Sequence, residues 1–495
     1  MNVLRVGQEL GQRGYRFVWL ISDSQPSSRT LAETRRFDNL EVIEYKAPQD
    51  EKFTQGGLSR DPMESIKTLV ADQQRAARGL FNDKAALQKL KDLGVELLLK
   101  DGAFAPASLL ADLLEVPSVD VVPIPVLLPW FSARYSIPQP VAYLPSLGAP
   151  FTPNMTLLQR VINLLASWAY QLLVMRPMGA ALGDLAAELN MTFPESRTAA
   201  GVSPTAAIIA VTDWAFEFPF PIPPKLHMVG PVLASNAKPL PQELSFFLSS
   251  GMSNGNKAVY VSMGTLTAMF EPELRSMALG LSALPNPVLW KLPSSDLPGN
   301  LSLTDLPLGP NIRTVDWASQ NDILGHPSVG AFVTQGGINS MHEAIFHAVP
   351  VVVTGLTADQ PMNALKAEHF GFGISLDPAR LDPVDKKPIE STIRRILTAP
   401  TFKANAIKLQ KRMHWTRHPA EKAADIVEKV LLTEGEEHLQ TGQHTLRWWQ
   451  NSLIDVYGVL ALMSVAALAM LCLAGCFIWR VMRRLGPRTV HFKQQ

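Results

Sequence analysis

Cysteine is almost absent from this chain of 495 residues. Only Cys472 and Cys476 occur, and both lie inside an apolar run near the C-terminus. The rest of the chain therefore contains neither a disulfide framework nor a thiolate metal site, whatever compartment it occupies. We accordingly assign no metal ion to its function.

An excess of charge of either sign is also absent. The 45 basic and 44 acidic side chains leave a net charge of +1, and 47% of the residues are hydrophobic while 18% are charged. This composition is typical of a globular protein and excludes a disordered chain or a tail that binds nucleic acid. At roughly 150 residues per domain, the length predicts two or three structural units.

Histidine is missing from the first half, and the usual nucleotide-binding fingerprints are missing throughout. All ten histidines lie at or beyond His227, so the first half offers no imidazole as a general base. No GxGxxG sequence opens either half, and no GxxxxGK(S/T) loop occurs. These absences disfavour a dinucleotide or P-loop enzyme, although a Rossmann-like enzyme that uses another nucleotide stays open as an alternative.

One long apolar run lies near the C-terminus. The 24 residues from Val456 to Trp479 carry no charge, which at about 1.5 Å per residue is enough to cross a hydrocarbon core about 30 Å thick. We predict a transmembrane helix, with a buried core helix as the weaker alternative. The positive-inside rule places the tail that follows in the cytosol, because its charges are all basic: Arg480, Arg483, Arg484, Arg488 and Lys493.

A cytosolic tail would place the body in a lumen. Three sequons, at Asn154, Asn190 and Asn300, permit glycosylation there. A translocated body needs a signal sequence, yet residues 1–23 contain no continuous apolar segment behind a basic start. A tail-anchored protein with a cytosolic body is therefore the alternative topology.

The first half shows the alternation of helices and strands that is typical of an α/β fold. We predict a helix over residues 3–10, a buried strand over 15–22, a second strand over 95–100 and a helix over 106–114, with another strand from Val116. Asp101 follows the second strand, at the carboxyl end where open α/β sheets bind ligands. The alternative role for Asp101 is to cap a turn.

An apolar stretch over residues 156–174 is predicted to be a helix. Gln159, Arg160, Asn163 and Gln171 interrupt it, so it is too polar to span a membrane. We expect its apolar side to face the core, with a position on the membrane surface as the alternative.

The second half contains the segment with the most chemical information. A proline-rich linker over residues 217–241 leads to a predicted strand, Ala258–Ser262, and the turn Met263-Gly264-Thr265, whose amides and hydroxyls suit phosphate. Residues 315–377 then predict a strand at 330–334, a turn at Gln335-Gly336-Gly337, a helix from Asn339 and a strand at 351–354.

This strand, glycine turn and helix suit a nucleoside diphosphate. The glycine pair lets the backbone approach an anion, and the first-turn amides of the helix favour a diphosphate. Asn339 and Glu343 share a helical face, and a carboxylate one turn further along can accept two hydrogen bonds from a ribose diol. Trp317 offers a flat surface for a base. Taken singly, Trp317 as core, the glycines as a turn, Glu343 as a solvated residue and Asp359 as a cap are ordinary alternatives.

Together these residues resemble the donor-binding signature of the UDP-glycosyltransferase family, in particular its membrane-anchored UDP-glucuronosyltransferase type. The similarity extends over nearly the whole chain, from Arg13-Gly14 to the apolar span and basic tail. The signature residues occur in order and with similar spacing: Trp317, Gln320, His326, Thr334, Gly336, Gly337, Asn339, Glu343, Pro350, Asp359, Gln360 and Asn363.

The resemblance implies a GT-B fold of class α/β, in which two Rossmann-like domains face each other across a cleft, plus one C-terminal transmembrane helix. It implies an acceptor-binding domain over residues 1–225, a linker over 226–242 and a UDP-sugar donor-binding domain over 243–440. A juxtamembrane segment at 441–455, the transmembrane helix at 456–479 and a basic cytosolic tail at 480–495 would follow. The endoplasmic reticulum is the expected location, with a lumenal body.

The resemblance also assigns roles within the donor site. Trp317 would stack on uracil, Gln320 would reach the base or ribose, and Glu343 would hold the ribose hydroxyls. Ser262, Thr265, Asn339 and Ser340 would bind the diphosphate at the turns that contain Gly336 and Gly337, and Asp359 with Gln360 would hold the sugar. Gln335 stands where the family usually has a histidine, so it donates a hydrogen bond without a positive charge. UDP-sugar is a co-substrate, so no cofactor is expected.

The catalytic base is the main departure from the family. The resemblance places a histidine after the first strand and assigns to Asp101 the role of orienting it, whereas this sequence starts just past that position. We expect that a short N-terminal stretch with signal, strand and histidine is missing. The first hypothesis is an inverting hexosyltransferase that transfers glucose or glucuronate from a UDP-sugar to a hydroxyl of a lipophilic small molecule. The alternative is a non-catalytic, membrane-anchored UDP-sugar-binding homologue, and either protein could form homo- or hetero-oligomers.

Overall fold

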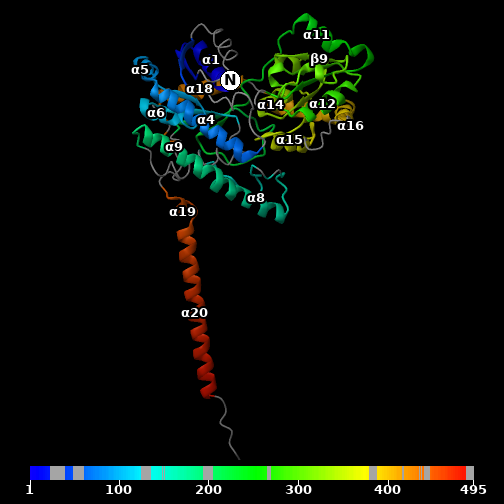
Figure 1. Cartoon of the computed structure of the whole chain (residues 1–495). Helices are drawn as coiled ribbons and strands as arrows, with labels where there is room; N and C mark the ends of the chain where they lie inside the picture. The colour runs from blue at the N-terminus through cyan, green and yellow to red at the C-terminus, as the bar shows by residue number, and fades with distance from the viewer. Residues whose placement is uncertain are drawn as a thin grey trace, which may run out of the picture. The chain divides into compact units, whose positions relative to one another are not determined.

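The computed structural model of this chain consists of two compact units, residues 1–439 and 440–495 (Figure 1). Each is described here by itself. The predicted donor residue Thr265 lies outside the described residues. The described ranges are 1–22, 40–47, 61–123, 135, 137–147, 149, 151–192, 205–264, 269–377, 387–414, 417–433, 435, 437–439 and 446–485.

The second half of the first unit contains a six-stranded parallel sheet. Its strand order is β12-β11-β10-β7-β8-β9. The chain enters at β7 in the centre, builds toward β9 on one side, and then returns to place β10 beside β7. The strands are β7 (Ala258–Ser262), β8 (Val288–Lys291), β9 (Ile312–Val315), β10 (Val329–Thr334), β11 (Val351–Val353) and β12 (Gly373–Ser375).

Both faces of this sheet are covered, as the continuous apolar runs of its strands predict. Phe332 and Tyr260 stack on one face with ring centroids 5.1 Å apart, while Val333 and Val261 belong to the core of the other face. The alternation follows from the two-residue period of a strand. The helices of this half are α11 (Gln242–Ser249), α12 (Glu271–Ser282), α13 (Gln320–Leu324), α14 (Ile338–Phe346), α15 (Gln360–His369), α16 (Lys387–Thr398) and α17 (Pro400–Met413).

The first half contains two parallel sheets. β1 (Phe17–Ser22) pairs with β2 (Leu40–Tyr45), and a four-stranded sheet has the order β3-β4-β5-β6. The latter comprises β3 (Leu98–Asp101), β4 (Ser118–Val122), β5 (Ala207–Ala210) and β6 (Leu226–Met228). Helix α1 (Asn2–Gln12) contacts β1 and β3, one strand from each sheet. The other helices are α4 (Pro62–Asn82), α5 (Lys84–Asp92), α6 (Ala107–Leu114), α8 (Leu157–Tyr170) and α9 (Arg176–Glu188).

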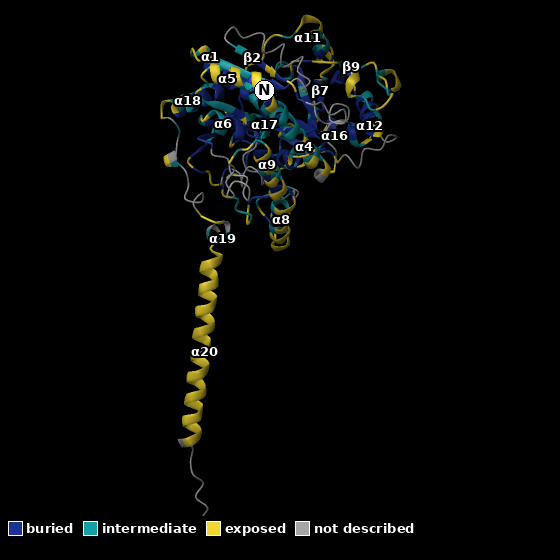
Figure 2. Ribbon diagram, turned by 60° about the vertical axis from the view of Figure 1, so that its left-hand side comes forward, coloured by how far each residue is buried: buried dark blue, intermediate teal, exposed yellow. Residues whose placement is uncertain are grey.

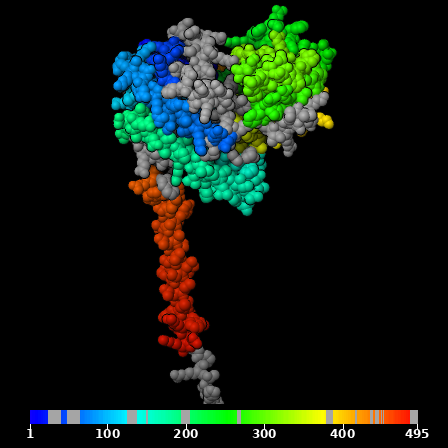
Figure 3. Space-filling view, in the orientation of Figure 1, coloured from blue at the N-terminus to red at the C-terminus, as the bar shows by residue number. Residues whose placement is uncertain are grey.

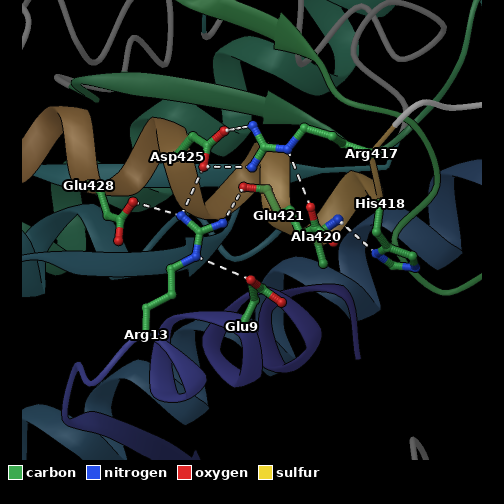
Figure 4. Close-up of polar contacts among 8 residues, drawn as sticks. All are labelled: Glu9, Arg13, Arg417, His418, Ala420, Glu421, Asp425 and Glu428. Atoms are coloured by element: carbon green, nitrogen blue, oxygen red, sulfur yellow. Dashed lines mark hydrogen bonds and ion pairs between the residues drawn. The ribbon is translucent and has the colours of Figure 1, made fainter.

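Helix α18 (Pro419–Leu432) connects the end of the first unit to its beginning, because it packs on α1 and β5. Arg13, at the C-terminal end of α1, joins them (Figure 4). Its guanidinium contacts Asp425 at 2.9 Å, Glu428 at 2.7 Å and Glu9 at 3.1 Å, and donates to the carbonyl of Glu421. Arg13 therefore links one carboxylate of α1 to two carboxylates of α18, and Asp425 also pairs with Arg417 at 2.7 Å.

Helix α8 differs from the sequence-based expectation. We expected the apolar side of residues 156–174 to face the core, and this is wrong. Leu158 is 68% exposed and Leu165 54% exposed, whereas Asn163 is fully buried. Figure 2 shows much of α8 in the yellow of exposed residues. The reason is that Asn163 accepts a hydrogen bond from the amide of Ser146 and donates to the carbonyls of Val141 and Leu144. The polar side of the helix is thus its docking side.

The second unit contains α19 (Trp448–Asn451) and α20 (Ile454–Leu485). Residues Ile454–Arg484 form the one helix in the described part of the chain that is long and apolar enough to cross a membrane. None of the most apolar 18-residue stretch of this helix is buried within the structure. The buried core helix that was the alternative for this run is therefore wrong.

The ion-pair cluster of Arg13 yields a stability prediction. Replacement of Arg13 by methionine (R13M) keeps most of the stem but removes the cation that Glu9, Asp425 and Glu428 share. Asp425 keeps its ion pair with Arg417, so the free energy of unfolding should fall by about 1–2 kcal/mol. Thermal unfolding of the full chain in detergent measures the effect. R16M is the matched control, because Arg16 is 63% exposed and its ion pair with Glu41 lies at the surface. Equal loss in both variants would contradict the role of the cluster.

Candidate functional site

The candidate site lies where the strand order of the second-half sheet reverses. β7 and β10 are neighbours, and their last residues, Ser262 and Thr334, are paired in register. Loops that leave adjacent strands in opposite directions open a ligand crevice at their carboxyl ends in doubly wound sheets. This pairing brings the Met263-Gly264 turn beside the Gln335-Gly336-Gly337 turn, as the site prediction requires.

Gly264 allows the close approach of these two turns, and Gly336 allows the second turn to pack against β11. Gly264 has φ +76°, and a Cβ there would lie 2.1 Å from Nε2 of Gln335. Gly336 has φ +91°, and a Cβ there would lie 2.4 Å from Val353. Gln335 itself is buried and its Oε1 accepts a hydrogen bond from the Thr334 hydroxyl at 3.1 Å. Its amide therefore lies over the turn after β7.

Helix α14 begins directly after the glycine turn. Gly337 occupies the N-cap position without a capping side chain, so the amides of the first turn point toward the turn. Asn339 and Ser340 are partly exposed at this end, whereas Met341 and Ile345 are fully buried. The unpaired amides and the positive end of the helix dipole favour an anion here.

Glu343 lies one turn further along α14 and is held by Gln320 of α13. Nε2 of Gln320 donates to Oε2 of Glu343 at 2.6 Å and to the hydroxyl of Ser340 at 2.9 Å. Burial raises the pKa of Glu343 to about 7; the hydrogen bond from Gln320 opposes this rise, and the negative charge of Asp322 adds to it. Glu343 is therefore a half-buried, oriented acceptor rather than the solvated residue of the alternative interpretation.

Trp317 lies at the edge of the same region. It is 54% exposed, so the core alternative for this residue is wrong. Lys291, the last residue of β8, places its Nζ 5.5 Å from the centre of the indole ring and donates to the carbonyl of Gly264 at 2.9 Å. A buried cation thus connects the turn after β7 with an exposed aromatic surface.

Asp359 and Gln360 follow the loop after β11. The amide oxygen of Gln360 accepts from the backbone of Leu356 and Thr357, which fixes the loop that precedes α15. Asp359 accepts from Asn363 at 2.6 Å, and Asn363 also donates to the carbonyl of Gly336. Burial raises the pKa of Asp359 to about 6. Asn363 therefore ties this carboxylate to the glycine turn.

A buried polar network lies behind these helices. Lys366 of α15 pairs with Glu217 at 2.5 Å, and Thr212 contacts both Glu217 at 3.0 Å and Nε2 of His342 at 3.1 Å. Burial, with the nearby charge of Lys366, lowers the pKa of His342 to about 3, so this imidazole stays neutral. The network joins the segment after β5 to helices α14 and α15.

Asp101 lies in the first half at the end of β3. It is exposed, and its Oδ1 accepts a hydrogen bond from the amide of Ala103 at 2.8 Å. This is the turn-capping contact of the alternative interpretation, and it leaves the carboxylate at the surface. The catalytic role of Asp101 stays a prediction.

Comparison with known proteins assigns this chain to a family. The model of the UDP-glucuronosyl and UDP-glucosyl transferase family matches residues 3–487. The chain belongs to this family. It is 27% identical to human UDP-glucuronosyltransferase 2B7 over 98% of this chain and 92% of that protein. It is 29% identical to UDP-glucuronosyltransferase 2A3 of Cavia porcellus over 94% and 84% of the respective chains.

Solved structures give the fold of this family member as GT-B. The calicheamicin glycosyltransferase CalG4 superposes with a TM-score of 0.57 at 19% identity, covering 87% of this chain and 94% of the other. A UDP-glucose:anthocyanidin 3-O-glucosyltransferase in complex with UDP gives 0.56 at 18% identity, covering 87% and 95%. The expected family and fold class are confirmed, and the chain is a glycosyltransferase of the UDP-sugar-dependent type.

Two groups of residues in this glycosyltransferase escaped the sequence analysis. Lys291 is the last residue of the apolar strand β8 and belongs to no motif. Its position at the carboxyl end of a strand is the signal that could have identified it. The Glu217–Lys366 pair and His342 lie far apart in sequence, and no local pattern could bring them together. The described part of the chain contains no group of acidic, cysteine or histidine side chains that could hold a metal ion.

The pKa of Glu343 yields a prediction about pH. The unfolded carboxyl releases its proton near pH 4.5, whereas the folded one keeps it to about pH 7. The folded state therefore binds the extra proton in this window, and its stability falls as pH rises through it. E343Q removes the titration, so its thermal midpoint relative to wild type should rise between pH 5 and pH 8.

Thermal unfolding at a series of pH values measures this difference. Q320M supplies a second readout, because loss of the hydrogen bond that lowers the pKa of Glu343 should move the pH dependence upward. A difference between wild type and E343Q that is constant with pH would show that this carboxylate is not desolvated.

Proposed function

We propose that this chain is a glycosyltransferase that transfers glucose or glucuronate from a UDP-sugar to a hydroxyl of a lipophilic small molecule, with inversion at the anomeric carbon. The observation that carries the donor half is the oriented Glu343 one turn beyond the glycine turn at the β7–β10 reversal. UDP-sugar-dependent transfer follows from the family, and the relatives named as glucuronosyl and glucosyl transferases support these two sugars.

The donor would lie along the carboxyl ends of β7, β8 and β10. Trp317 stacks on uracil, and Glu343, held by Gln320, accepts from both ribose hydroxyls. Ser262, Asn339 and Ser340 donate to the diphosphate together with the first amides of α14. Lys291 supplies the positive charge that Gln335 lacks, because its Nζ lies between the Gly264 turn and Trp317.

The sugar would extend toward Asp359 and Gln360. These residues precede and begin α15, and Asn363 fixes Asp359 against the glycine turn. Asp359 can accept from sugar hydroxyls when it is ionised. Nothing at this end favours glucose over glucuronate.

Transfer requires an activated acceptor. The acceptor oxygen attacks the anomeric carbon from the face opposite to UDP, the bond to the diphosphate oxygen breaks, and the hydroxyl proton passes to a base. A positioned base typically contributes about 10²- to 10⁴-fold in rate. We assign to Asp101 the role of orienting the base in this step. The sequence contains no histidine before His227.

The membrane topology forms part of the proposal. The basic residues that follow the apolar run Val456–Trp479 favour a cytosolic tail and hence a lumenal body in the endoplasmic reticulum. The three sequon asparagines, Asn154, Asn190 and Asn300, are all exposed, as glycosylation requires. Lipophilic acceptors partition into the same membrane.

Binding of UDP-glucose tests the donor site. A ribose diol donates to the ionised form of Glu343, so the affinity should be about tenfold higher at pH 8 than at pH 6, given a pKa of about 7. UDP-glucose suits this test because its diphosphate is esterified at both ends and lacks the ionisation near pH 6. Calorimetry on the full chain measures the dissociation constant.

Two comparisons sharpen this measurement. E343Q should bind more weakly at pH 8 and lose most of the pH dependence, because an amide offers one acceptor oxygen where the ionised carboxylate offers two. Asp359, with a pKa of about 6, still titrates in this variant. An excess of NAD should not displace UDP-glucose. Displacement by NAD, or unchanged binding by E343Q, would contradict this assignment of the donor site.

Turnover tests the acceptor half. With UDP-glucose or UDP-glucuronate and a phenol acceptor, we expect the 495-residue chain to bind donor but transfer slowly, because its first half offers no imidazole base. D101N should reduce transfer further without changing donor affinity. Fast transfer would show that the imidazole is dispensable, and complete absence of transfer with intact donor binding would favour the non-catalytic alternative.

A further inference from the structure

The segment that follows β5 in the first half packs against the C-terminal end of helix α15. Phe216 of this segment is fully buried, and its ring centroid lies 6.0 Å from that of Phe370 and 5.8 Å from that of Phe372. The rings of Phe218 and Phe370 are 5.9 Å apart. Figure 3 shows little of the yellow of this part of the chain on the face that it draws. A helix of the donor side is therefore held by aromatic residues of the first half.

A buried ion pair lies beside this aromatic contact. Nζ of Lys366 lies 2.5 Å from Oε2 of Glu217 and 5.1 Å from the ring centroid of Phe216. The Lys366 side chain is 0% exposed and that of Glu217 is 4% exposed. The other carboxylate oxygen of Glu217 accepts a hydrogen bond from the hydroxyl of Thr212 at 3.0 Å. Both charges are thus compensated inside the protein.

Lys366 shares one face of α15 with two residues at the sugar end. Asp359 is the N-cap of α15, and Asn363 and Lys366 follow it at the spacing that aligns side chains along a helix. Asn363 is fully buried, and its Nδ2 donates to Oδ2 of Asp359 at 2.6 Å and to the carbonyl of Gly336 at 2.9 Å. One row of side chains therefore leads from the buried ion pair to the Asp359 carboxylate.

The two charges of the pair act on Asp359 with opposite sign. Burial raises the pKa of Asp359 to about 6, and the hydrogen bond from Asn363 opposes this rise. The positive charge of Lys366 also opposes it, whereas the negative charge of Glu217 adds to it. The ionisation of a carboxylate on the donor side therefore depends on a residue of the first half.

Other titratable groups around α15 bear less on Asp359. Strands β11 and β12, which pack on α15, carry no charged side chain. Helix α14 brings His342, which burial keeps neutral, and Glu343, whose carboxylate contacts Gln320. Glu368 and His369 are exposed at the opposite end of α15. The Glu217–Lys366 pair is thus the charged group that faces the row.

We propose that Glu217 and Lys366 are positioning residues of the sugar subsite. The pair anchors α15 to the first half so that the carboxylate of Asp359 faces the sugar, and its two charges bear on that carboxylate in opposite directions. This inference rests on the proposed function, because it takes Asp359 as an acceptor for sugar hydroxyls. It adds control of donor binding by a residue outside the segment 243–440.

The affinity of UDP-glucose relative to the methyl ester of UDP measures the sugar subsite. Both diphosphates are esterified at both ends, so neither ligand has the phosphate ionisation near pH 6. Titration of Glu343 affects the two ligands alike and cancels in the ratio of their dissociation constants. Calorimetry on the full chain in detergent gives this ratio between pH 5 and pH 8. In the wild type the advantage of UDP-glucose should rise with a midpoint near pH 6, because the ionised Asp359 accepts from sugar hydroxyls.

Single substitutions in the pair should move this midpoint in opposite directions. K366M removes the cation that favours the ionised carboxylate, so the midpoint rises; a rise of about one unit makes the advantage about fivefold smaller at pH 6. E217Q removes the opposing anion, so the midpoint falls. A merely structural defect would instead weaken the advantage in both variants without moving the midpoint. Unmoved midpoints, or midpoints that move in the same direction, overturn the proposal.

Two further variants separate this effect from loss of stability. Each single variant leaves a buried charge without its partner, which is destabilising. K100M is the matched control, because Lys100 is also buried and pairs with a buried carboxylate, Asp120, within the sheet of the first half. It should lower the thermal midpoint of unfolding and leave the pH midpoint unchanged. A shifted pH midpoint in K100M contradicts the specific role of the pair.

The reversed pair E217K/K366E keeps the test decisive if a single variant does not fold. It retains two partnered charges but places the anion at position 366, whose charge has the larger influence on Asp359. The pH midpoint should therefore rise, as in K366M, while the chain stays folded. A midpoint equal to that of the wild type overturns the proposal.

Failure of the proposed function gives a different pattern. If the donor site did not bind nucleotide, neither UDP-glucose nor the methyl ester would bind at any pH. Equal affinity of the two ligands in the wild type would show that Asp359 does not hold the sugar, and this inference would fail with that part of the proposed function. If the ratio titrates in the wild type but ignores the Glu217–Lys366 pair, this inference alone fails.

Discussion

The parallel pairing of β7 with β10 is the constraint on which the donor site depends. It places Ser262 and Thr334 side by side, and with them the two glycine turns that follow. The second turn needs Gly264 in the first, because Gln335 occupies the space where a Cβ of residue 264 would lie. When the two turns lie side by side, the start of α14 faces the region where Lys291 and Trp317 lie. A shift of register between β7 and β10 would separate the start of α14 from the Met263-Gly264 turn.

The second constraint is the buried network that connects the two halves of the first unit. Glu217 follows β5 of the first half, whereas its partner Lys366 belongs to a donor-side helix. Both side chains are almost completely buried, so removal of either leaves an uncompensated charge. The pair therefore holds α15, and through Asn363 the glycine turn, at a fixed position beside the first half. The geometry of the candidate site thus depends on residues outside the segment 243–440.

Helix α8 buries asparagine and serine while it exposes leucine. The hydrogen bonds of Asn163 to residues 141–146 fix this orientation. The apolar content of the chain outside its span is therefore not a measure of its core alone.

The sequence by itself determined the family, the GT-B fold class, the apolar span and most elements around the site. The strand periods, the glycine turn and the spacing from Trp317 to Asn363 are local or nearly local patterns. It could not decide which side of α8 faces inward. Hydrophobic periodicity shows that the helix has an apolar and a polar side, but not which of them contacts the rest of the protein. It also could not find Lys291 near Trp317 or Glu217 paired with Lys366, since these contacts join residues that only the folded sheet brings together. The carboxylate of Glu343 is the clearest case: the sequence supplied the residue, and only desolvation and Gln320 in the tertiary structure decided its charge.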